Sequence, residues 1–360
     1  MRVLFDDQIY SMMTHGGVAR YHYELIKALN YINVETNLPL FFSNNYYIRK
    51  RDVSTHISSL PFNLKIFNKT LPWFNRYFSK RAILKQEFDV FHPTSYALYF
   101  LDKLQNKPFV VTVHDMISEI YDKNNDINKI KRELVLKANK IIAISENTKK
   151  DILSFIPIDE KKIDVVYHGN TLVDDGVCLI EHTKNINPYF LYVGGRQQYK
   201  NFEFLLKAFS IISHKYQVSL ICTGSNFTPN EMGLLHKYHI ENVVKASIIK
   251  SDREMCQLYK NAISFIYPSL YEGFGMPILE AFACKCPVLL SDTSCFPEIA
   301  QDAGLYFSPF NLDSLIHSME KILLDDSLKR VLIKKGQERE KQFSWNAAAK
   351  QTLEVYKSVL

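Results

Sequence analysis

Residues 263–292 read ISFIYPSLYEGFGMPILEAFACKCPVLLSD, and this stretch contains the pattern that decides the fold. An apolar run at 263–267 is followed by a glycine loop, a helix that starts near Pro277, and a second apolar run at 287–291. Neither run alternates polar and apolar residues, which is typical of parallel strands that helices cover on both faces. Proline suits the first turn of a helix. The stretch therefore predicts a β-α-β unit.

The same alternation of apolar runs and helical segments extends along the chain. It predicts strands at Arg2–Phe5, Val90–His92, Phe109–His114, Lys140–Ser145, Asp164–Tyr167, Phe190–Val193, Val218–Thr223, Val243–Ala246, Ile263–Tyr267, Pro287–Ser291 and Leu305–Phe307. Repeated β-α units predict doubly wound α/β domains, whose ligands bind beyond the carboxyl ends of the strands. The polar stretch 170–187 lacks periodicity and separates two similar sets of strands. We therefore expect two Rossmann-like domains, 1–170 and 171–344, facing a central cleft.

Composition excludes several classes of protein. The chain has 360 residues, of which 47% are hydrophobic and 23% charged, and a net charge of +6. This is a folded protein without the dense basic stripe of a nucleic-acid binder, so we predict no nucleic-acid partner. No apolar run approaches the roughly 18 residues of a membrane span, and two aspartates interrupt the N-terminal stretch, so we predict neither a span nor a signal peptide.

The cysteine spacing predicts neither a zinc site nor a disulfide framework. No pair has the C-x-x-C spacing, and the closest pair, Cys284 and Cys286, suits no metal site. Reduced thiols are typical of a cytoplasmic protein. We therefore predict a cytoplasmic location, with the protein either soluble or held on a membrane surface.

Glycine and histidine follow predicted strands in the first half. Gly16 and Gly17 directly precede a helical pattern, where backbone N–H groups can bind an anion, although a simple turn explains the pair as well. His114, in VVTVHDMI, ends a buried strand and would face a ligand at that edge of the sheet. A structural histidine is the alternative.

Cations follow the first strand of the second half. The sequence GGRQQYKN, 194–201, places Arg196 and Lys200 between a glycine turn and a helix. Arginine binds a diphosphate bidentately and lysine binds it as a point charge, but exposed charges at a helix start are the alternative. The next strand ends in Thr223 and Gly224, a turn that can pass close to a nucleotide base.

Two carboxylates flank the glycine loop of the opening stretch. Glu272 precedes Gly273, Phe274 and Gly275, and Glu280 lies in the helix that follows. A carboxylate can accept two hydrogen bonds from a vicinal diol, as in ribose or a hexose. The alternative is that both glutamates only favour the helix N-terminus.

These motifs together resemble one family over almost the whole chain. The block EGFGMPILEA with its E-x7-E spacing, the sequence GGRQQYKN, the early glycine pair and the strand-end His-Asp resemble retaining glycosyltransferases of family 4, which have the GT-B fold. The segments FDDQIY and GGVARY are similar to those of bacterial mannosyltransferases that build O-antigens or other surface polysaccharides. The resemblance implies a hexosyltransferase.

The resemblance also implies roles for residues around the donor sugar. Glu280 would bind the donor ribose, and Glu272 would contact the donor hexose. The backbone groups of Gly273, Phe274 and Gly275 would lie beside that hexose.

Further roles concern the diphosphate and the reacting carbon. The resemblance implies that Arg196 and Lys200 bind the diphosphate with help from Gly16 and Gly17. His114 would contact the transferred sugar near the reacting carbon.

One departure from the family pattern concerns the first cation. Many members have an arginine directly after the strand glycine, where this chain has Gly195, so that Arg196 comes one residue later. The sequence contains no D-x-D triplet, the motif with which many glycosyltransferases hold a divalent ion. Preorganised cations and N–H groups can stabilise the leaving diphosphate instead. We therefore expect a metal-independent reaction without cofactor, and the resemblance implies retention of configuration.

The resemblance implies the remaining partners. The donor would be a nucleotide-sugar, GDP-mannose by preference, and the acceptor a glycan or a lipid-linked glycan. Family members often return a C-terminal helix to the first domain, and residues 345–360 read as such a helix.

Residues 46–87 are basic and aromatic. They contain nine Lys or Arg and two acidic residues, interleaved with Phe, Tyr and a Trp. This composition suits an anionic membrane, here the inner face of the plasma membrane, where a lipid-linked acceptor would lie. A solvated basic face over an aromatic core is the alternative.

Other functions fit less of the sequence. A GT-B nucleotide-sugar epimerase acts on the donor alone and leaves the basic aromatic segment without a role. A non-catalytic glycan- or lipid-binding subunit of an assembly complex predicts loss of the donor motif, which is present. A dinucleotide-dependent oxidoreductase lacks support because no G-x-G-x-x-G follows the first strand.

Overall fold

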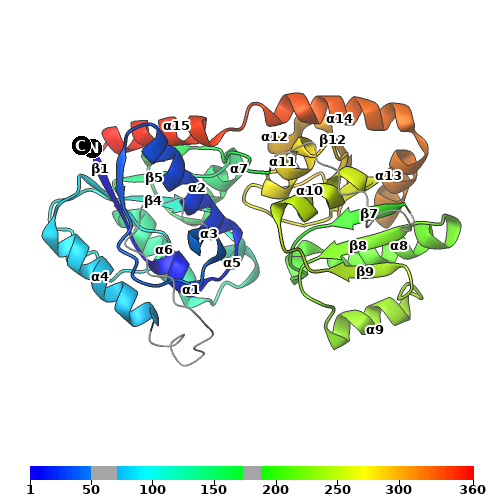
Figure 1. Cartoon of the computed structure of the whole chain (residues 1–360), viewed down its shortest axis with the longest axis horizontal. Helices are drawn as coiled ribbons and strands as arrows, with labels where there is room; N and C mark the ends of the chain where they lie inside the picture. Colours follow the sequence, from blue (N-terminus) through cyan, green and yellow to red (C-terminus); the bar gives the residue numbers. More distant parts are fainter. Residues whose placement is uncertain (50–70, 173–187) are drawn as a thin grey trace. The chain divides into compact units, whose positions relative to one another are not determined.

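The computed structural model describes residues 1–49, 71–172 and 188–360 (Figure 1). The chain divides into two compact units, which are residues 1–169 with 344–360, and residues 170–343. Each unit is built on parallel strands, so the predicted α/β fold class with two domains is confirmed.

The first unit has six described strands in two three-stranded sheets. Their orders are β2-β1-β3 and β4-β5-β6, and a parallel bridge between Phe91 and Phe109 joins them. The strands are β1 (Arg2–Phe5), β2 (Glu35–Asn37), β3 (Val90–His92), β4 (Val110–Val113), β5 (Lys140–Ala143) and β6 (Ile163–Val165). The helices are α1 (Gln8–Met12), α2 (Gly17–Tyr31), α3 (Tyr46–Arg49), α4 (Leu71–Lys85), α5 (Ile117–Tyr121), α6 (Asp126–Lys137), α7 (Glu146–Phe155) and α15 (Trp345–Lys357).

Strands β1, β3, β4 and β5 are buried on both faces, which explains their continuous apolar runs, whereas the short strand β2 is exposed or half-buried. Val3 and Phe5 of β1 pack into a core with α2 and α15, whereas Leu4 packs into a second core with α4, α6 and α7. Successive side chains of a strand point to opposite faces, so a strand between two helix layers needs apolar residues at every position.

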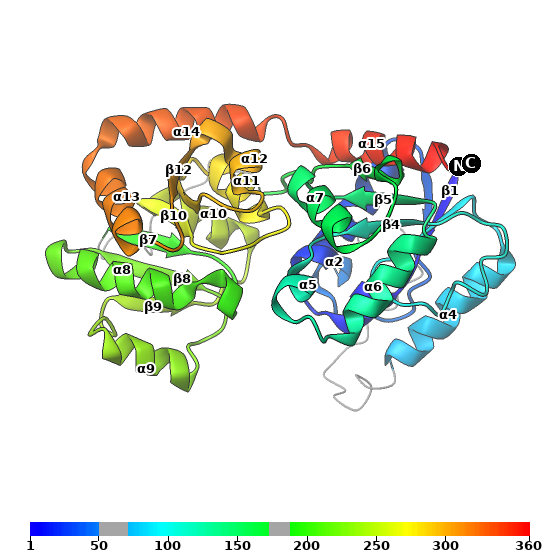
Figure 2. The ribbon, with the colours of Figure 1, turned by 180° about the vertical axis from the view of Figure 1, so that it is seen from behind.

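The C-terminal helix α15 belongs to the first unit and packs along α2. Its Tyr356 is fully buried, and the Tyr356 hydroxyl lies 2.6 Å from Nδ1 of His92 at the end of β3. Both ends of the described chain lie together in this unit (Figures 1 and 2).

The second unit has one six-stranded sheet in the order β12-β11-β10-β7-β8-β9. Its strands are β7 (Tyr189–Tyr192), β8 (Ser219–Thr223), β9 (Val244–Ser247), β10 (Ser264–Tyr267), β11 (Val288–Ser291) and β12 (Gly304–Phe307). Its helices are α8 (Phe202–Lys215), α9 (Pro229–Lys237), α10 (Asp252–Asn261), α11 (Met276–Ala283), α12 (Phe296–Ala300), α13 (Leu312–Leu324) and α14 (Asp326–Glu340). The helices α8 and α13 pack together over one face of the sheet (Figure 2).

The strand order of the second unit reverses between β7 and β10. From β7 the chain continues to β8 and β9 on one side of the sheet. It then crosses to the other side of β7, where β10, β11 and β12 follow in order. The loops after β7 and β10 therefore follow neighbouring strands at the carboxyl edge of the sheet. Open α/β sheets bind their ligands at such a switch point.

Candidate active site

Lys200 and Glu272 form an ion pair at the switch point of the second sheet. Lys200 ends a short 3₁₀ turn, Gln198–Lys200, after β7, and Glu272 follows β10. The distance from Lys200 Nζ to Glu272 Oε1 is 2.5 Å, and the two side chains are only 14% and 11% exposed. The Leu270 N–H also donates to the Tyr199 carbonyl at 2.8 Å, so main chain and side chains both join the two loops.

The surroundings of this pair are aromatic and hydrogen-bonded. The ammonium group of Lys200 lies over the rings of Tyr199 and Tyr267, at 5.3 and 5.5 Å from their centroids. The Ser294 hydroxyl accepts from the Glu272 N–H at 3.1 Å and lies 2.7 Å from the Glu272 carbonyl, to which it donates. The pair is therefore fixed by neighbours on several elements, in a setting where charges interact more strongly than in water.

The glycine loop after Glu272 leads into α11 through a left-handed residue. Gly275 is the N-cap of α11 and has φ of +85°, a conformation that residues with a Cβ adopt only with strain. A Cβ at Gly275 would lie 3.1 Å from Cδ1 of Ile278 and 3.3 Å from Cε1 of Phe296. Glycine is required here by both conformation and space. Gly273 and Phe274 lie in the same loop.

Glu280 lies in α11, where its carboxylate is buried against α10. Tyr259, on α10, donates from its hydroxyl to Oε2 of Glu280 at 3.1 Å. Burial, with the adjacent Glu280 charge, raises the pKa of the Tyr259 hydroxyl well above its usual value, so the tyrosine remains a donor. The E-x7-E motif thus has one carboxylate, Glu272, at the switch point and the other, Glu280, on α11 with a hydrogen bond from Tyr259.

Arg196 is held away from Lys200. Its Nε donates to Oε1 of Glu231 at 2.6 Å, and its Nη2 donates to the carbonyls of Ser225 and Asn226 at 2.8 and 3.0 Å. Both carbonyls belong to the loop after β8. The structure therefore brings Lys200 and Glu272 together but holds the Arg196 side chain against the loop after β8.

In the first unit, the predicted glycine pair begins α2. Gly16 is the N-cap, with φ of +147°, and Gly17 is the first helical residue. A Cβ at Gly16 would lie 3.3 Å from Sδ of Met13, so a side chain there would also be crowded. The first N–H groups of this 15-residue helix follow directly.

His114 follows β4 and has one ring nitrogen without a protein partner. Its Nε2 is buried and makes no hydrogen bond to the described residues, while its backbone N–H donates to the Tyr96 hydroxyl at 3.3 Å. Tyr21 packs edge-on against the ring, with centroids 4.9 Å apart. Burial, reinforced by the nearby Lys131 charge, lowers the pKa of His114 to about 3, so its imidazole is neutral at physiological pH.

Sequence reasoning missed a buried ion pair beneath the His114 loop. Lys131 of α6 is 2% exposed; it donates to Oε2 of Glu119 at 2.8 Å and to the Asp115 carbonyl at 3.1 Å. The available signal was spacing, because Lys131 shares the buried face of α6 with Leu134 and Val135. A lysine in an apolar stripe predicts a buried partner.

The described parts of the basic aromatic segment are residues 46–49 and 71–87, whereas residues 50–70 lie outside the described residues. Most of the second part is the helix α4. Its inward face carries Asn75, Ser79 and Ile83, and Asn75 accepts from the N–H groups of two residues after β2 and donates to a carbonyl there. Its outward stripe, four residues apart at each step, is exposed and consists of Trp73, Tyr77, Arg81 and Lys85. Phe74 and Leu84 are also exposed.

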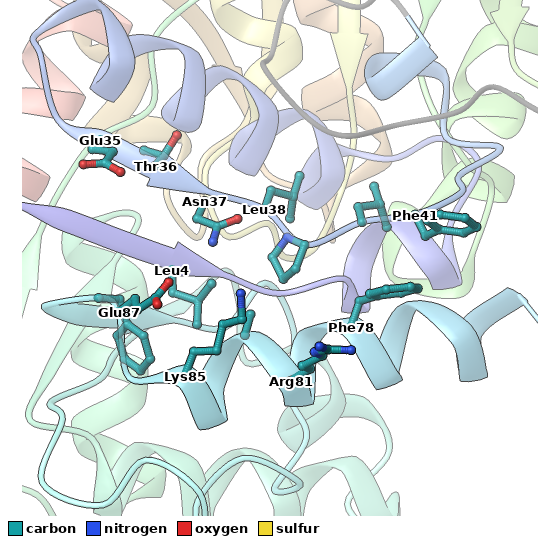
Figure 3. A pocket seen from close by; sticks show the side chains of 14 residues that line it. Leu4, Glu35, Thr36, Asn37, Leu38, Phe41, Phe78, Arg81, Lys85 and Glu87 are labelled. Atoms are coloured by element: carbon teal, nitrogen blue, oxygen red, sulfur yellow. The ribbon is translucent and has the colours of Figure 1, made fainter.

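A trough of about 510 Å³ lies between α4 and β2 (Figure 3). Phe41 and Phe78 stack at one end, with ring centroids 5.1 Å apart, while Glu35 and Glu87 lie toward the other. The lining also includes Arg81 and Lys85 of α4. The aromatic and basic side of α4 thus borders a hollow surface.

No helix in the described ranges is both long and apolar enough to cross a membrane. Among the same residues, no group of three or more His, Cys, Asp or Glu is arranged to hold a metal ion.

Comparison with known families identifies the chain's relatives. The model "Glycosyltransferase Family 4" matches residues 15–171, and the model "Glycosyl transferases group 1" matches residues 181–339. Each half of the chain therefore matches a glycosyltransferase family model. The two models together account for most of both units, and the resemblance carried by the sequence motifs is confirmed.

Two bacterial relatives of this glycosyltransferase are named as O-antigen mannosyltransferases. O-antigen chain mannosyltransferase B of Escherichia coli is 34% identical over 173 residues, which are 47% of this chain and 45% of the relative. O-antigen chain mannosyltransferase RfbU of Salmonella typhimurium is 28% identical over 226 residues, which are 61% of this chain and 62% of the relative. The matches thus span about half to three fifths of these proteins.

Solved structures of GT-B glycosyltransferases share the fold of the whole chain. Sucrose-phosphate synthase of Thermosynechococcus elongatus superposes with a TM-score of 0.77 at 21% identity, covering 99% of this chain and 98% of that one. Anabaena HepE, solved in complex with UDP and glucose, gives a TM-score of 0.78 at 17% identity and covers 99% and 100%. The predicted GT-B fold is therefore confirmed.

Proposed function

We propose that this family 4 glycosyltransferase moves a hexose, mannose by preference, from a nucleotide-sugar to a growing, lipid-linked bacterial surface polysaccharide, with retention of configuration and without a metal ion. The observation that carries the proposal is the buried pair of Lys200 and Glu272 at the switch point. Glu280 lies on the helix that follows the Glu272 loop. Two relatives named as O-antigen mannosyltransferases support the choice of sugar and product.

The second unit would bind the donor. Lys200 neutralises the charge that develops on the leaving diphosphate, and Glu272 accepts hydrogen bonds from hydroxyls of the hexose. In the absence of donor each group has the other as its partner. With donor bound, the diphosphate would pair with Lys200, and the hexose hydroxyls would donate to Glu272. Glu280 accepts from the ribose hydroxyls, while the Tyr259 hydroxyl keeps this carboxylate oriented.

The first unit would contribute to the transferred sugar and the phosphates. His114 has a neutral imidazole, and its Nε2 makes no hydrogen bond to the described residues, so it can pair with a sugar hydroxyl without adding charge near the reacting carbon. Gly16 and Gly17 open α2, whose first N–H groups can approach the diphosphate. The acceptor hydroxyl attacks from the face that the diphosphate leaves, which retains the configuration and needs no protein nucleophile.

An anionic membrane surface would bind the acceptor side of the protein. The exposed stripe of Trp73, Tyr77, Arg81 and Lys85 combines aromatic rings for the interfacial region with cations for lipid phosphates. A lipid-linked acceptor lies in the same plane, so this contact would place the protein at the inner face of the plasma membrane.

Calorimetric titration of the purified protein with GDP-mannose, UDP-glucose, UDP-N-acetylglucosamine and dTDP-rhamnose tests the proposal. We expect one donor, GDP-mannose, to bind selectively, and the affinity to fall strongly in Glu280→Ala. The bound donor is then offered with lipid-linked glycan acceptors, and product linkage is read by NMR. Binding that Glu280→Ala leaves intact would overturn the donor site, and donor binding without transfer to any acceptor would favour a non-catalytic subunit.

A further inference from the structure

The guanidinium group of Arg196 is built into the loop between β8 and α9. Besides its bonds to Glu231 and to the Ser225 and Asn226 carbonyls, its Nη2 lies 3.3 Å from the Ser225 hydroxyl. It also lies over the ring of Phe227, 5.0 Å from the centroid. The Arg196 side chain is only 5% exposed. One side chain therefore contacts every residue from Ser225 to Phe227.

Glu231 fixes the other end of this arrangement. It lies in the first turn of α9 and closes a capping box: Oε2 accepts from the Thr228 N–H at 2.7 Å, and the Glu231 N–H donates to the Thr228 hydroxyl at 3.3 Å. Burial opposes ionisation of Glu231, but the hydrogen bonds from Arg196 and Thr228 outweigh it and hold its pKa below the usual value. Both carboxylate oxygens are thus engaged, one by the arginine and one by the cap.

This geometry is unfavourable for a direct contact between Arg196 and a diphosphate. The arginine would have to leave a carboxylate that is only 15% exposed and give up its bonds to two carbonyls. Breaking a buried ion pair leaves an uncompensated charge, which is costly. The position in the chain agrees, because Arg196 comes one residue after the place that the family pattern gives to a phosphate-binding arginine.

The loop that Arg196 holds lies at the carboxyl edge of the sheet, beside the candidate donor site. Strands β7 and β8 are neighbours, and the Gly194 N–H donates to the Thr223 hydroxyl at 3.4 Å. Gly224 has φ of +117°, and its N–H donates to the Ser247 carbonyl at 3.1 Å, so the turn is fixed from the β9 side as well.

We propose that Arg196 is a positioning residue that acts through Glu231: together they hold residues 224–228 as the wall of the nucleobase site, and Lys200 alone supplies the second unit's side-chain cation for the diphosphate. This inference rests on the proposed function, since it assigns the part of the nucleotide that each residue serves. It also predicts that Arg196 contributes to the choice of base rather than to the departure of the leaving group.

The first experiment is hydrogen exchange on the ligand-free protein, which needs no donor. Amides of residues 224–231 exchange faster in Arg196→Gln and in Glu231→Gln than in wild type, whereas Lys200→Gln leaves them unchanged. Unchanged exchange in both variants would overturn the positioning role. Thermal melting followed by circular dichroism shows whether Arg196→Gln and Glu231→Gln fold. If one of them does not fold, the exchange rates of the other decide whether the positioning role holds.

The second experiment first finds which of GDP, UDP and dTDP the wild-type protein binds best. It then measures the affinity of wild type and variants for that diphosphate and for the matching monophosphate. Because either variant removes charged hydrogen bonds that hold the loop, we expect Arg196→Gln and Glu231→Gln each to weaken both ligands about tenfold or more. Lys200→Gln weakens mainly the diphosphate. A direct phosphate contact predicts the opposite for Glu231→Gln, which would release the arginine and tighten binding.

The two experiments separate this inference from the proposed function. Wild-type protein that binds none of the three diphosphates contradicts the donor site, and the exchange experiment still decides whether Arg196 holds the loop. Tighter diphosphate binding in Glu231→Gln contradicts the positioning role but supports the donor site.

Discussion

Lys200 and Glu272 meet across the point where the strand order of the second sheet reverses, with Nζ 2.5 Å from Oε1. The two residues are far apart in the sequence and follow strands that are neighbours in the sheet, β7 and β10. A charged ligand that takes the Lys200 ammonium group would have to separate this pair, and other hydrogen-bond donors would then have to meet the Glu272 carboxylate.

Replacing Lys200 by methionine should slow glycosyl transfer by about 100-fold or more, because the ammonium group stabilises charge that develops in the transition state. The measurement is kcat/KM for the donor established by titration. The control is Lys207→Met, which removes an exposed lysine from the adjacent α8. A Lys200→Met enzyme within a factor of ten of wild type would refute the assignment to the diphosphate.

Substituting Gly275 by alanine should lower the free energy of unfolding by about 1–2 kcal/mol, since an L-residue in the left-handed region is strained and the new methyl group meets Ile278 at 3.1 Å. Gly233, within α9, has nothing near its Cβ position, so Gly233→Ala should be neutral or stabilise by up to about 1 kcal/mol. Urea denaturation of both variants compares these values. Equal effects of the two substitutions would show that the Gly275 conformation has no special cost.

Acid should destabilise the first unit through its buried histidines. Burial, with a smaller effect of His114, lowers the pKa of His92 to about 3, whereas the unfolded chain has the ordinary value of 6.5. Between these pH values the unfolded state binds more protons, so the free energy of unfolding falls as pH drops below 6.5, by up to about 1.4 kcal/mol per pH unit for each such histidine. Above pH 7 this contribution is constant.

Denaturant titrations from pH 7.5 to pH 4 measure this slope. His22 and His168 are buried in the same group, and burial lowers their pKa values too. Replacing His92 by glutamine should therefore make the slope shallower without removing it. A slope unaffected by His92→Gln would contradict the role given to this residue.

Removing the charge of Lys131 should destabilise the first unit strongly. Lys131→Met leaves the Glu119 carboxylate buried without its cation, which typically costs about 3–5 kcal/mol, and the double variant Lys131→Met/Glu119→Gln should recover part of the loss. The matched control is Lys129→Met, an exposed lysine of the same helix. If the double variant were no more stable than the single one, the Lys131–Glu119 coupling would be absent.

Charge reversal on α4 should release the protein from membranes. Vesicles that contain anionic lipid should sediment the wild-type protein at low salt, and Arg81→Glu/Lys85→Glu should lose most of this binding because each cation near such a surface contributes about 1 kcal/mol. The double variant Lys334→Glu/Lys341→Glu on the second unit is the control. Equal binding by all three proteins would assign the contact to another surface.

The sequence predicted the strands well where burial dictated their composition. Every predicted strand is present, because a strand between two helix layers needs continuous apolar residues. The missing element was β2, Glu35–Asn37, whose residues are polar. It is a short strand at the edge of its sheet, so neither composition nor periodicity distinguishes it from a loop.

The candidate site was predictable where it depends on strand ends and not where it depends on side-chain partners. Lys200 and Glu272 follow adjacent strands, so a parallel fold already implies that they are near each other. The orientation of Arg196 is set by Glu231, which lies 35 residues away on another helix. Nothing in GGRQQYKN indicates that partner, and the motif alone favoured a phosphate.

The return of α15 to the first unit has a consequence for biosynthesis. Residues 344–360 pack along α2, and Tyr356 fills part of the same core as the first strand. On the ribosome, residues 1–169 emerge first, the second unit emerges next, and α15 emerges only after both. The first unit is thus synthesised first but completed last. In a nascent chain arrested before residue 344, the surface of the first unit that α15 covers would be exposed to chaperones.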